Sequence, residues 1–74
     1  MRITVKLFAY FRDNRFREKV AEYPEGTTVA DIIRSLQIDL SEVGVTMLNS
    51  RHCNLDQVPA EGDQLAIFPA IGGG

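Results

Sequence analysis

Apolar and polar residues alternate at the start of the chain. Ile3, Val5 and Leu7 are the apolar members of this segment, and a polar residue precedes each of them. A period of two is typical of a strand with one buried face. We therefore predict a half-buried first strand, with Phe8 falling on its polar face.

A less regular region follows. Residues 9–15 mix aromatic and charged side chains, which predicts a turn or short helical loop with Phe11 tucked into the core. Residues 17–23 form a weaker, polar-leaning strand pattern that suits the edge of a sheet, with Val20 facing outward. Residues 24–26, Pro-Glu-Gly, are typical of a turn.

The clearest helix signal begins at Thr28. A threonine is a good N-cap, and Asp31 three residues later makes an acidic variant of the capping box. The apolar residues that follow have the i, i+3, i+4, i+7 spacing of one helical face: Val29, Ile32, Ile33 and Leu36. This stripe predicts a helix lying across a sheet, with its apolar face in the core.

The second half of the chain predicts three further strands. An irregular connection broken by Gly44 leads to a strand at 45–48, and the hairpin turn Asn49–Ser50 ends it. Residues 53–55 suit a short return strand, and residues 56–61 suit a loop or a single helical turn.

The last predicted strand runs from Gln64 to Phe68. Its alternation places Leu65 and Ile67 on one face and Phe68 on the other. The full order is strand, strand, helix, strand, short strand, strand. This order predicts an α+β fold of the β-grasp type, a mixed sheet of four to five strands with one main helix packed across it. We expect the last strand to lie centrally, beside the first.

The chain ends in three glycines, Gly72, Gly73 and Gly74. Glycines have no side chains to pack and lose much entropy when ordered, so we expect residues 1–71 to form the domain and residues 72–74 a flexible tail. Counted from Pro69, the last six residues extend at most about 20 Å. Such a thin arm with a free carboxylate suits insertion into another protein's active site. The alternative is a frayed terminus.

Composition and charge argue against several kinds of partner and site. The 74 residues carry a net charge of −2 without a basic block, which argues against nucleic-acid and membrane partners. The single cysteine, Cys53, excludes an intrachain disulfide and a cysteine-ligated cluster, and we expect no metal site. No signal peptide or membrane-spanning run is present, so the expectation is a soluble, cytoplasmic protein.

Four segments carry a family resemblance. They are Leu7-Phe8-Ala9-Tyr10-Phe11-Arg12, Pro24-Glu25-Gly26-Thr27-Thr28-Val29-Ala30-Asp31, Leu48-Asn49-Ser50-Arg51, and Gly62-Asp63-Gln64-Leu65-Ala66-Ile67-Phe68-Pro69, followed by the terminal Gly73-Gly74. In order, spacing and ending, the sequence resembles the MoaD/ThiS family of ubiquitin-like sulfur carriers, and most closely the MoaD type, the small subunit of molybdopterin synthase. It departs from the MoaD pattern at Ser50, where glycine is usual, and in the triple glycine, which is also found in some ThiS-type tails.

The resemblance implies a function without catalysis by the domain itself. An ATP-dependent adenylating enzyme would activate the carboxylate of Gly74, and a sulfur donor protein would convert it to a thiocarboxylate. The large subunit of molybdopterin synthase would then receive the sulfur. The protein would be a co-substrate that binds no cofactor, and the ATP would be used by its partner.

Several related functions share this tail. The sulfur acceptor could belong to molybdenum or tungsten cofactor synthesis, or to thiamin synthesis through a thiazole synthase, or to tRNA thiolation or cysteine synthesis. An activated Gly74 could also join a lysine, as in a ubiquitin-like modifier. The tail cannot separate these alternatives.

A partner-binding surface is expected beside the tail. Phe68 points away from the helix and would adjoin Phe8 if the first and last strands are neighbours, and exposed aromatic residues near a functional terminus are typical of binding surfaces. The alternative is that a loop covers them. The full predicted surface is Phe8, Phe68, Pro69, Ala70 and Ile71.

Other candidates for chemistry are weaker. His52 and Cys53 are adjacent, so on a strand they would point to opposite faces, which favours a surface histidine and a buried thiol. Arg12 and Arg51 suit partner contacts and ordinary solvation equally well. The acidic residues form no paired-carboxylate arrangement.

Overall fold

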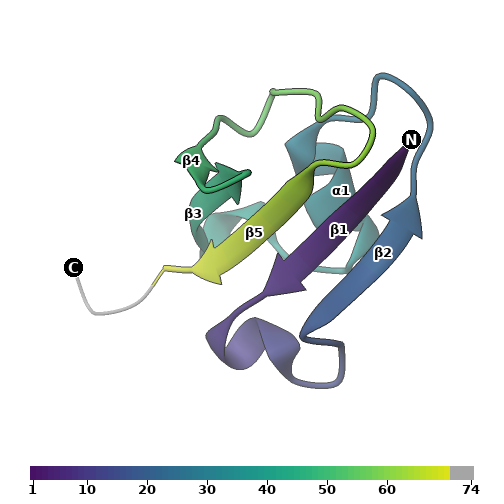
Figure 1. Cartoon of the computed structure of the whole chain (residues 1–74). Coiled ribbons are helices and arrows are strands. Elements are labelled where there is room, and N and C mark those ends of the chain that lie inside the picture. The colour runs from purple at the N-terminus through teal and green to yellow at the C-terminus, as the bar shows by residue number, and fades with distance from the viewer. Residues whose placement is uncertain (71–74) are drawn as a thin grey trace.

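The computed structural model describes residues 1–70. Over these residues, one mixed sheet is built in the strand order β2-β1-β5-β3-β4. Its strands are β1 (Arg2–Leu7), β2 (Glu18–Glu22), β3 (Val43–Leu48), β4 (Arg51–His52) and β5 (Gln64–Pro69). The helix α1 (Val29–Ser35) crosses one face, and two short 3-10 helices, η1 (Ala9–Arg12) and η2 (Leu40–Glu42), join the elements (Figure 1). This is the predicted β-grasp fold.

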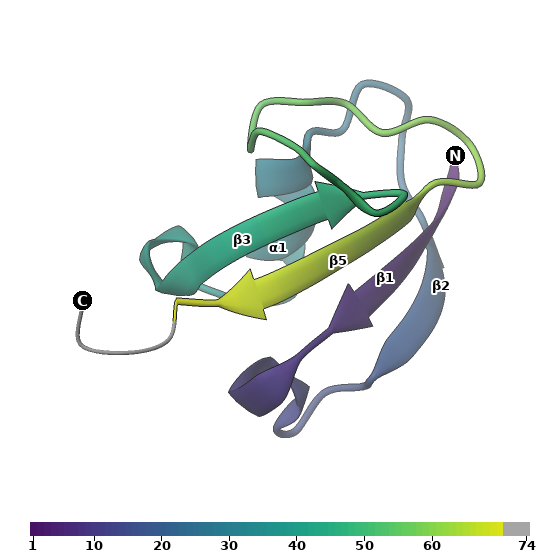
Figure 2. The same cartoon turned by 60° about the vertical axis from the view of Figure 1, so that its left-hand side comes forward.

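The last strand is central, as predicted. β5 pairs in parallel with β1, with Val5 opposite Leu65 and Leu7 opposite Ile67, and it pairs antiparallel with β3 on its other side. Figure 2 shows β5 between these two strands, with α1 behind the sheet. Parallel neighbours end at the same edge of a sheet, so the chain leaves β5 beside the end of β1.

The core lies between the sheet and α1. Most of its buried apolar residues come from the predicted inward faces of the strands and helix, and Phe11 of η1 joins them as predicted: Ile3, Val5, Leu7, Phe11, Val29, Ile32, Ile33, Leu65 and Ile67. Ile38 and Leu48 are also buried there, although no inward face was predicted for them. Val20 faces outward on the edge strand, also as predicted.

The predicted capping box starts α1. Thr28 Oγ1 accepts a hydrogen bond from the amide of Asp31, and the Asp31 carboxylate accepts one from the amide of Thr28, both at 3.1 Å. These reciprocal bonds satisfy two amides that the helix itself leaves free.

The short return strand was predicted at the wrong place. β4 is Arg51–His52, not residues 53–55, because pairing resumes directly after the predicted turn at Asn49 and Ser50. Asn49 and Ser50 have φ values of 51° and 70°, the left-handed conformations of a tight hairpin turn, which pair Arg51 with Leu48 at once. The chain then diverges after Cys53, whose amide still donates to the carbonyl of Thr46.

Gly44 also differs from its prediction. It lies inside β3, which begins at Val43, and does not break the chain before the strand. The register between β3 and β5 shifts at this residue, so that Gly44 is the extra residue of a β-bulge.

Candidate functional site

The rings of Phe8 and Phe68 stack on the sheet face opposite α1. Their centroids are 4.1 Å apart and their planes differ by 13°. The parallel register that sets Leu7 opposite Ile67 brings the next residue of each strand together. The prediction that the two aromatic residues are neighbours is confirmed, and both rings are partly exposed.

A shallow hollow extends this aromatic pair across the sheet. Its volume is about 200 Å³, and its lining comes from β1, β3, β5 and the hairpin turn: Lys6, Phe8, Met47, Ser50, Gln64, Ala66 and Phe68. Val45 lies opposite Phe68 in the ladder and is 37% exposed, so it continues the apolar surface on β3. We call Phe8, Phe68, Val45 and Met47 the aromatic face.

Val45 and Met47 were missed by the sequence reasoning. Their own strand alternates, with Thr46 and Leu48 buried on its inner face, but no inward face was predicted for it. Their membership of the aromatic face follows only from the pairing of β3 with β5, which sets Val45 opposite Phe68 and Met47 opposite Ala66. Side chains opposite each other in a ladder share a face of the sheet.

Arg12 contacts the aromatic pair at the Phe8 ring. Its guanidinium lies 5.1 Å from the centroid of the Phe8 ring, within the range of a cation–π interaction. Its Nε donates a hydrogen bond of 2.7 Å to the carbonyl of Leu7. Both contacts fix Arg12 at the end of β1, so this side chain has a structural role beside any role in binding.

The end of β5 is fixed by backbone contacts. Pro69 continues the inward alternation of the strand and is buried, whereas Ala70 is exposed and donates its amide to the carbonyl of Glu42 at 2.8 Å. A Cβ on Gly44 would lie 2.8 Å from the Cα of Ala70 and 2.9 Å from the carbonyl oxygen of Pro69. Gly44 therefore permits a close backbone crossing where the chain leaves the sheet.

The predicted site residues do not all lie on one surface of the structure. Phe8, Phe68 and Ala70 lie at the surface near one end of β5, and Pro69 lies on its inner face. The predicted Ile71, Gly72, Gly73 and Gly74 fall outside the described residues.

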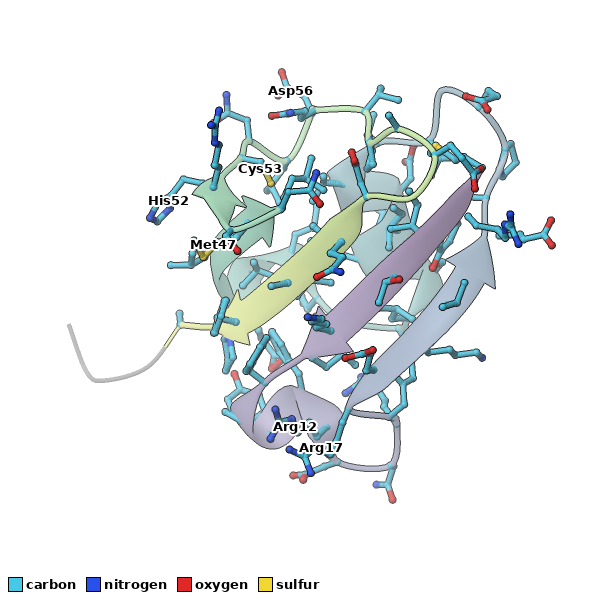
Figure 3. All side chains as sticks on the ribbon, viewed as in Figure 1. Arg12, Arg17, Met47, His52, Cys53 and Asp56 are labelled. Carbon is cyan, nitrogen blue, oxygen red and sulfur yellow. The ribbon has the colours of Figure 1, made fainter. Side chains whose placement is uncertain are left out.

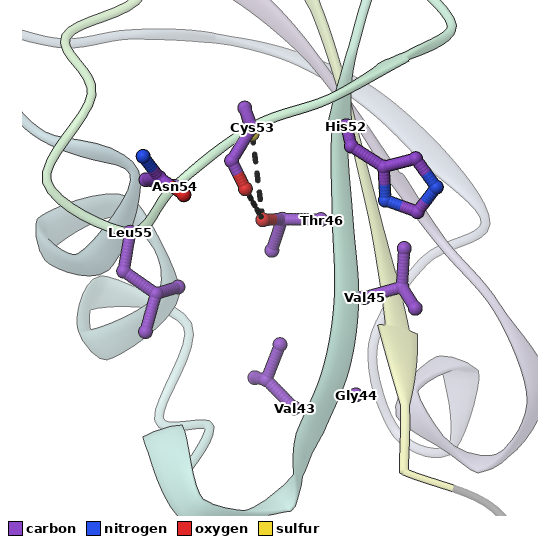
Figure 4. A pocket seen from close by; sticks show the side chains of 8 residues that line it. All are labelled: Val43, Gly44, Val45, Thr46, His52, Cys53, Asn54 and Leu55. Carbon is purple, nitrogen blue, oxygen red and sulfur yellow. Dashed lines mark hydrogen bonds between the residues drawn. The ribbon is translucent and has the colours of Figure 1, made fainter.

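Cys53 and His52 point apart, as predicted. The Cys53 thiol donates to Thr46 Oγ1 at 3.4 Å, and this hydroxyl in turn donates to the carbonyl of Cys53 at 2.9 Å (Figure 4). The thiol is partly buried and the imidazole is exposed. A hollow of about 240 Å³ lies beside them, between β3 and the loop at Asn54 and Leu55.

Neither a cluster of metal ligands nor a membrane-spanning helix is found among residues 1–70. Residues 1–70 contain no group of three or more histidine, cysteine or acidic side chains placed to hold a metal ion. None of the helices described there is long and apolar enough to span a membrane.

The shifted carboxyl groups serve local structure. Hydrogen bonds from Thr28 lower the pKa of Asp31, and those from Ser41 lower the pKa of Asp39. The backbone amide of Arg2 similarly lowers the pKa of Glu61. None of the three lies among the residues that form the aromatic face.

Comparison with known proteins identifies the same architecture. A model of the ThiS family matches residues 5–74. No curated protein matches the sequence. Among solved structures, a putative molybdopterin converting factor subunit 1 from Pyrococcus furiosus is 26% identical, with a TM-score of 0.78 and coverage of 96% of this chain and 99% of that one.

Two further solved structures share the fold. SAMP1 from Haloferax volcanii is 23% identical, with a TM-score of 0.77 and full coverage of both chains. A complex of subunits 1 and 2 of the molybdopterin-converting factor from Helicobacter pylori matches at 18% identity, with a TM-score of 0.67 and full coverage of both chains.

Proposed function

The chain belongs to the ThiS family, and we propose that it is a sulfur carrier whose C-terminal Gly74 is converted to a thiocarboxylate. The observation that carries this proposal is the extent of the family match. It runs over residues 5–74 and so includes the terminal glycines together with the strands that precede them.

The chemistry needs an activated carboxyl group. A carboxylate is ionised at neutral pH and is a poor electrophile. Attack of the Gly74 carboxylate on the α-phosphate of ATP releases pyrophosphate and forms an acyl adenylate. Sulfide then attacks the acyl carbon and AMP departs with the bridging oxygen, which leaves a thiocarboxylate. A persulfide gives the same product after a thiol cleaves its S–S bond.

In this reaction the protein is a co-substrate, because its partners supply the catalytic groups. The adenylating enzyme supplies the ATP site, and a sulfur donor protein supplies the sulfur. The described residues contribute a rigid base, since β5 is paired on both sides and Ala70 is bonded to Glu42. We propose that the aromatic face docks onto these partners, because a partly exposed aromatic pair can anchor an interface.

We favour molybdopterin as the product of the pathway. The similarity to the Pyrococcus furiosus protein described as a molybdopterin converting factor subunit 1 supports this branch. The Helicobacter pylori structure pairs subunit 1 with subunit 2, which supports a large synthase subunit as the partner that consumes the thiocarboxylate.

A reconstitution separates this branch from thiamin synthesis. Thiocarboxylated protein is mixed with the large molybdopterin synthase subunit and its pterin precursor, or with a thiazole synthase and its substrates. We expect sulfur transfer only in the first mixture, with unmodified protein as the control. Transfer only in the second mixture would reassign the pathway, and an isopeptide bond from Gly74 to a lysine would favour a modifier.

A further inference from the structure

Positive charge is concentrated in one short segment of the chain. Residues 6–19 contain five cations, Lys6, Arg12, Arg15, Arg17 and Lys19, and two carboxylates, Asp13 and Glu18, for a net charge of +3. The rest of the chain has three cations and eight carboxylates, a net charge of −5. The overall charge of −2 therefore conceals a strong separation of charge.

The fold gathers these cations at one end of the sheet. Arg12 Nε donates to the carbonyl of Leu7, and the amide of Leu7 donates to the carbonyl of Arg17, so both arginines flank the last residue of β1. Figure 3 shows Arg12 and Arg17 together at this end. We call the five cations the basic end.

Arg12 of η1 and Arg15 in the turn after it donate their hydrogen bonds to backbone carbonyl oxygens and not to carboxylates. Arg15 donates to the carbonyls of Phe11, Leu36 and Gln37, and Arg12 donates to that of Leu7. The ion pairs within residues 1–70 use the N-terminal amine, Arg2 and Arg34. None of the five cations of the basic end forms an ion pair with a carboxylate of residues 1–70, and only Lys6 has a carboxylate, Glu18, opposite it in the β1–β2 ladder.

The basic end lies at the same end of the sheet as the place where the chain leaves β5. β1 and β5 are parallel and in register from Thr4 to Leu7, so their ends lie side by side. Arg12 also lies against Phe8, which makes the basic end continuous with the aromatic face. A partner that takes up the C-terminus meets both surfaces at once.

We propose that the basic end docks onto an acidic protein surface, which borders the opening through which a partner enzyme receives the C-terminus. This proposal rests on the proposed function and adds the chemistry of the partner's contact surface. A protein fits better than a nucleic acid, because the remaining charge of −5 would repel a phosphate backbone that extends past this end. Opposed charges at the edge of an interface act mainly by speeding association.

The test uses a charge reversal at Arg17, whose exposed side chain forms none of the hydrogen bonds or ion pairs found among residues 1–70. The matched control is Arg2→Glu, which makes the same charge change at the opposite, exposed end of β1. Association rates are measured by stopped flow with the adenylating enzyme and, separately, with the large synthase subunit, at low and high salt. Circular dichroism verifies that both variants fold. If Arg17→Glu does not fold, Lys19→Glu takes its place as the test variant.

We expect Arg17→Glu to slow association with at least one partner about tenfold or more at low salt. The difference should shrink to about twofold in 0.5 M salt, where the screening length is only a few ångströms. Arg2→Glu should have little effect at either salt concentration. Equal effects of the two variants, or an effect of Arg17→Glu that salt does not reduce, would overturn the proposal.

Two further outcomes are distinguishable. Binding of a short single-stranded oligonucleotide that Arg17→Glu abolishes, without any effect on the protein partners, would overturn the proposal in favour of a nucleic acid. If the wild-type protein binds its partners with the expected charge dependence yet gains no sulfur, the proposed function fails while the basic end retains its partner.

Discussion

Phe8 and Phe68 stack face to face at the ends of two parallel strands, with their centroids 4.1 Å apart. They are the last outward-facing residues before the chain turns away from each strand, since Leu7 and Ile67 face the core immediately before them. The stack therefore marks the end of the rigid sheet. It also joins the basic end to the exit of the C-terminal segment.

Phe68→Ala should weaken partner binding more than it weakens the fold. Ile67→Ala removes a fully buried side chain and should cost about 2–5 kcal/mol of unfolding free energy. Phe68 is partly exposed, so its loss should cost the monomer less, about 0.5–1.5 kcal/mol of it from the stack with Phe8. An interface anchor is worth about 2 kcal/mol or more, which is roughly 30-fold in affinity.

Denaturant melts and binding titrations on both variants separate the two effects. Phe8→Ala serves as a second probe of the same stack. Equal destabilisation by Phe68→Ala and Ile67→Ala, with unaltered partner affinity, would show that Phe68 acts as a core residue.

Gly44→Ala should destabilise the end of the sheet. The added Cβ would meet backbone atoms of Pro69 and Ala70 at 2.8–2.9 Å, and backbone cannot move aside as a flexible side chain can. We expect a loss of about 1–3 kcal/mol, typical of overpacking. Amide hydrogen exchange should also show faster exchange at Ala70, whose bond to Glu42 is displaced. Unchanged stability and protection would contradict the close crossing.

Ser50→Gly should stabilise the protein. Ser50 has a φ of 70°, a left-handed conformation that costs a non-glycine residue about 1–2 kcal/mol. The matched control is Ser35→Gly at the end of α1, where the same change should destabilise because glycine weakens a helix. Thermal melts of both variants should shift in opposite directions. A fall in both midpoints would mean that the turn does not strain Ser50.

Acid should remove part of the stability of α1. Hydrogen bonds from Thr28 lower the pKa of Asp31 in the folded state, so this group stabilises the fold above its ordinary pKa of about 4. That contribution is lost as the pH falls through the lower folded pKa. The stability advantage of wild type over Asp31→Asn should be full near neutral pH and disappear in strong acid. A constant difference across this range in denaturant melts would contradict the assignment.

Period-two alternation was enough to predict the faces of β1 and β5, because each buries one face against α1. It also placed Phe8 and Phe68 on a common surface once the β-grasp order was assumed. The same alternation places Pro69 on the inner face, although that residue was predicted as part of the partner-binding surface. Extending the pattern by one residue would have found this.

Features that depend on pairing could not be predicted from local sequence. The hairpin turn at Asn49 and Ser50 was predicted, but the start of β4 directly after it was not, because it depends on the left-handed conformation of both residues. Gly44 lies within β3 because a bulge accommodates Ala70, a contact between residues far apart in the chain. The concentration of cations in residues 6–19 is visible in the sequence, but its place beside the end of β5 depends on the pairing of β1 with β5.

The central claim is that Gly74 carries the transferred sulfur, and intact-protein mass spectrometry tests it most directly. The protein is incubated with its adenylating enzyme, ATP and a sulfur donor, beside a variant that lacks Gly73 and Gly74. The account predicts that one oxygen is replaced by one sulfur at Gly74 in the wild type. The shortened variant should gain no sulfur and should melt at nearly the same temperature, because glycines bring no side chains to the core. An unchanged wild-type mass in the presence of a demonstrably active enzyme would contradict the account.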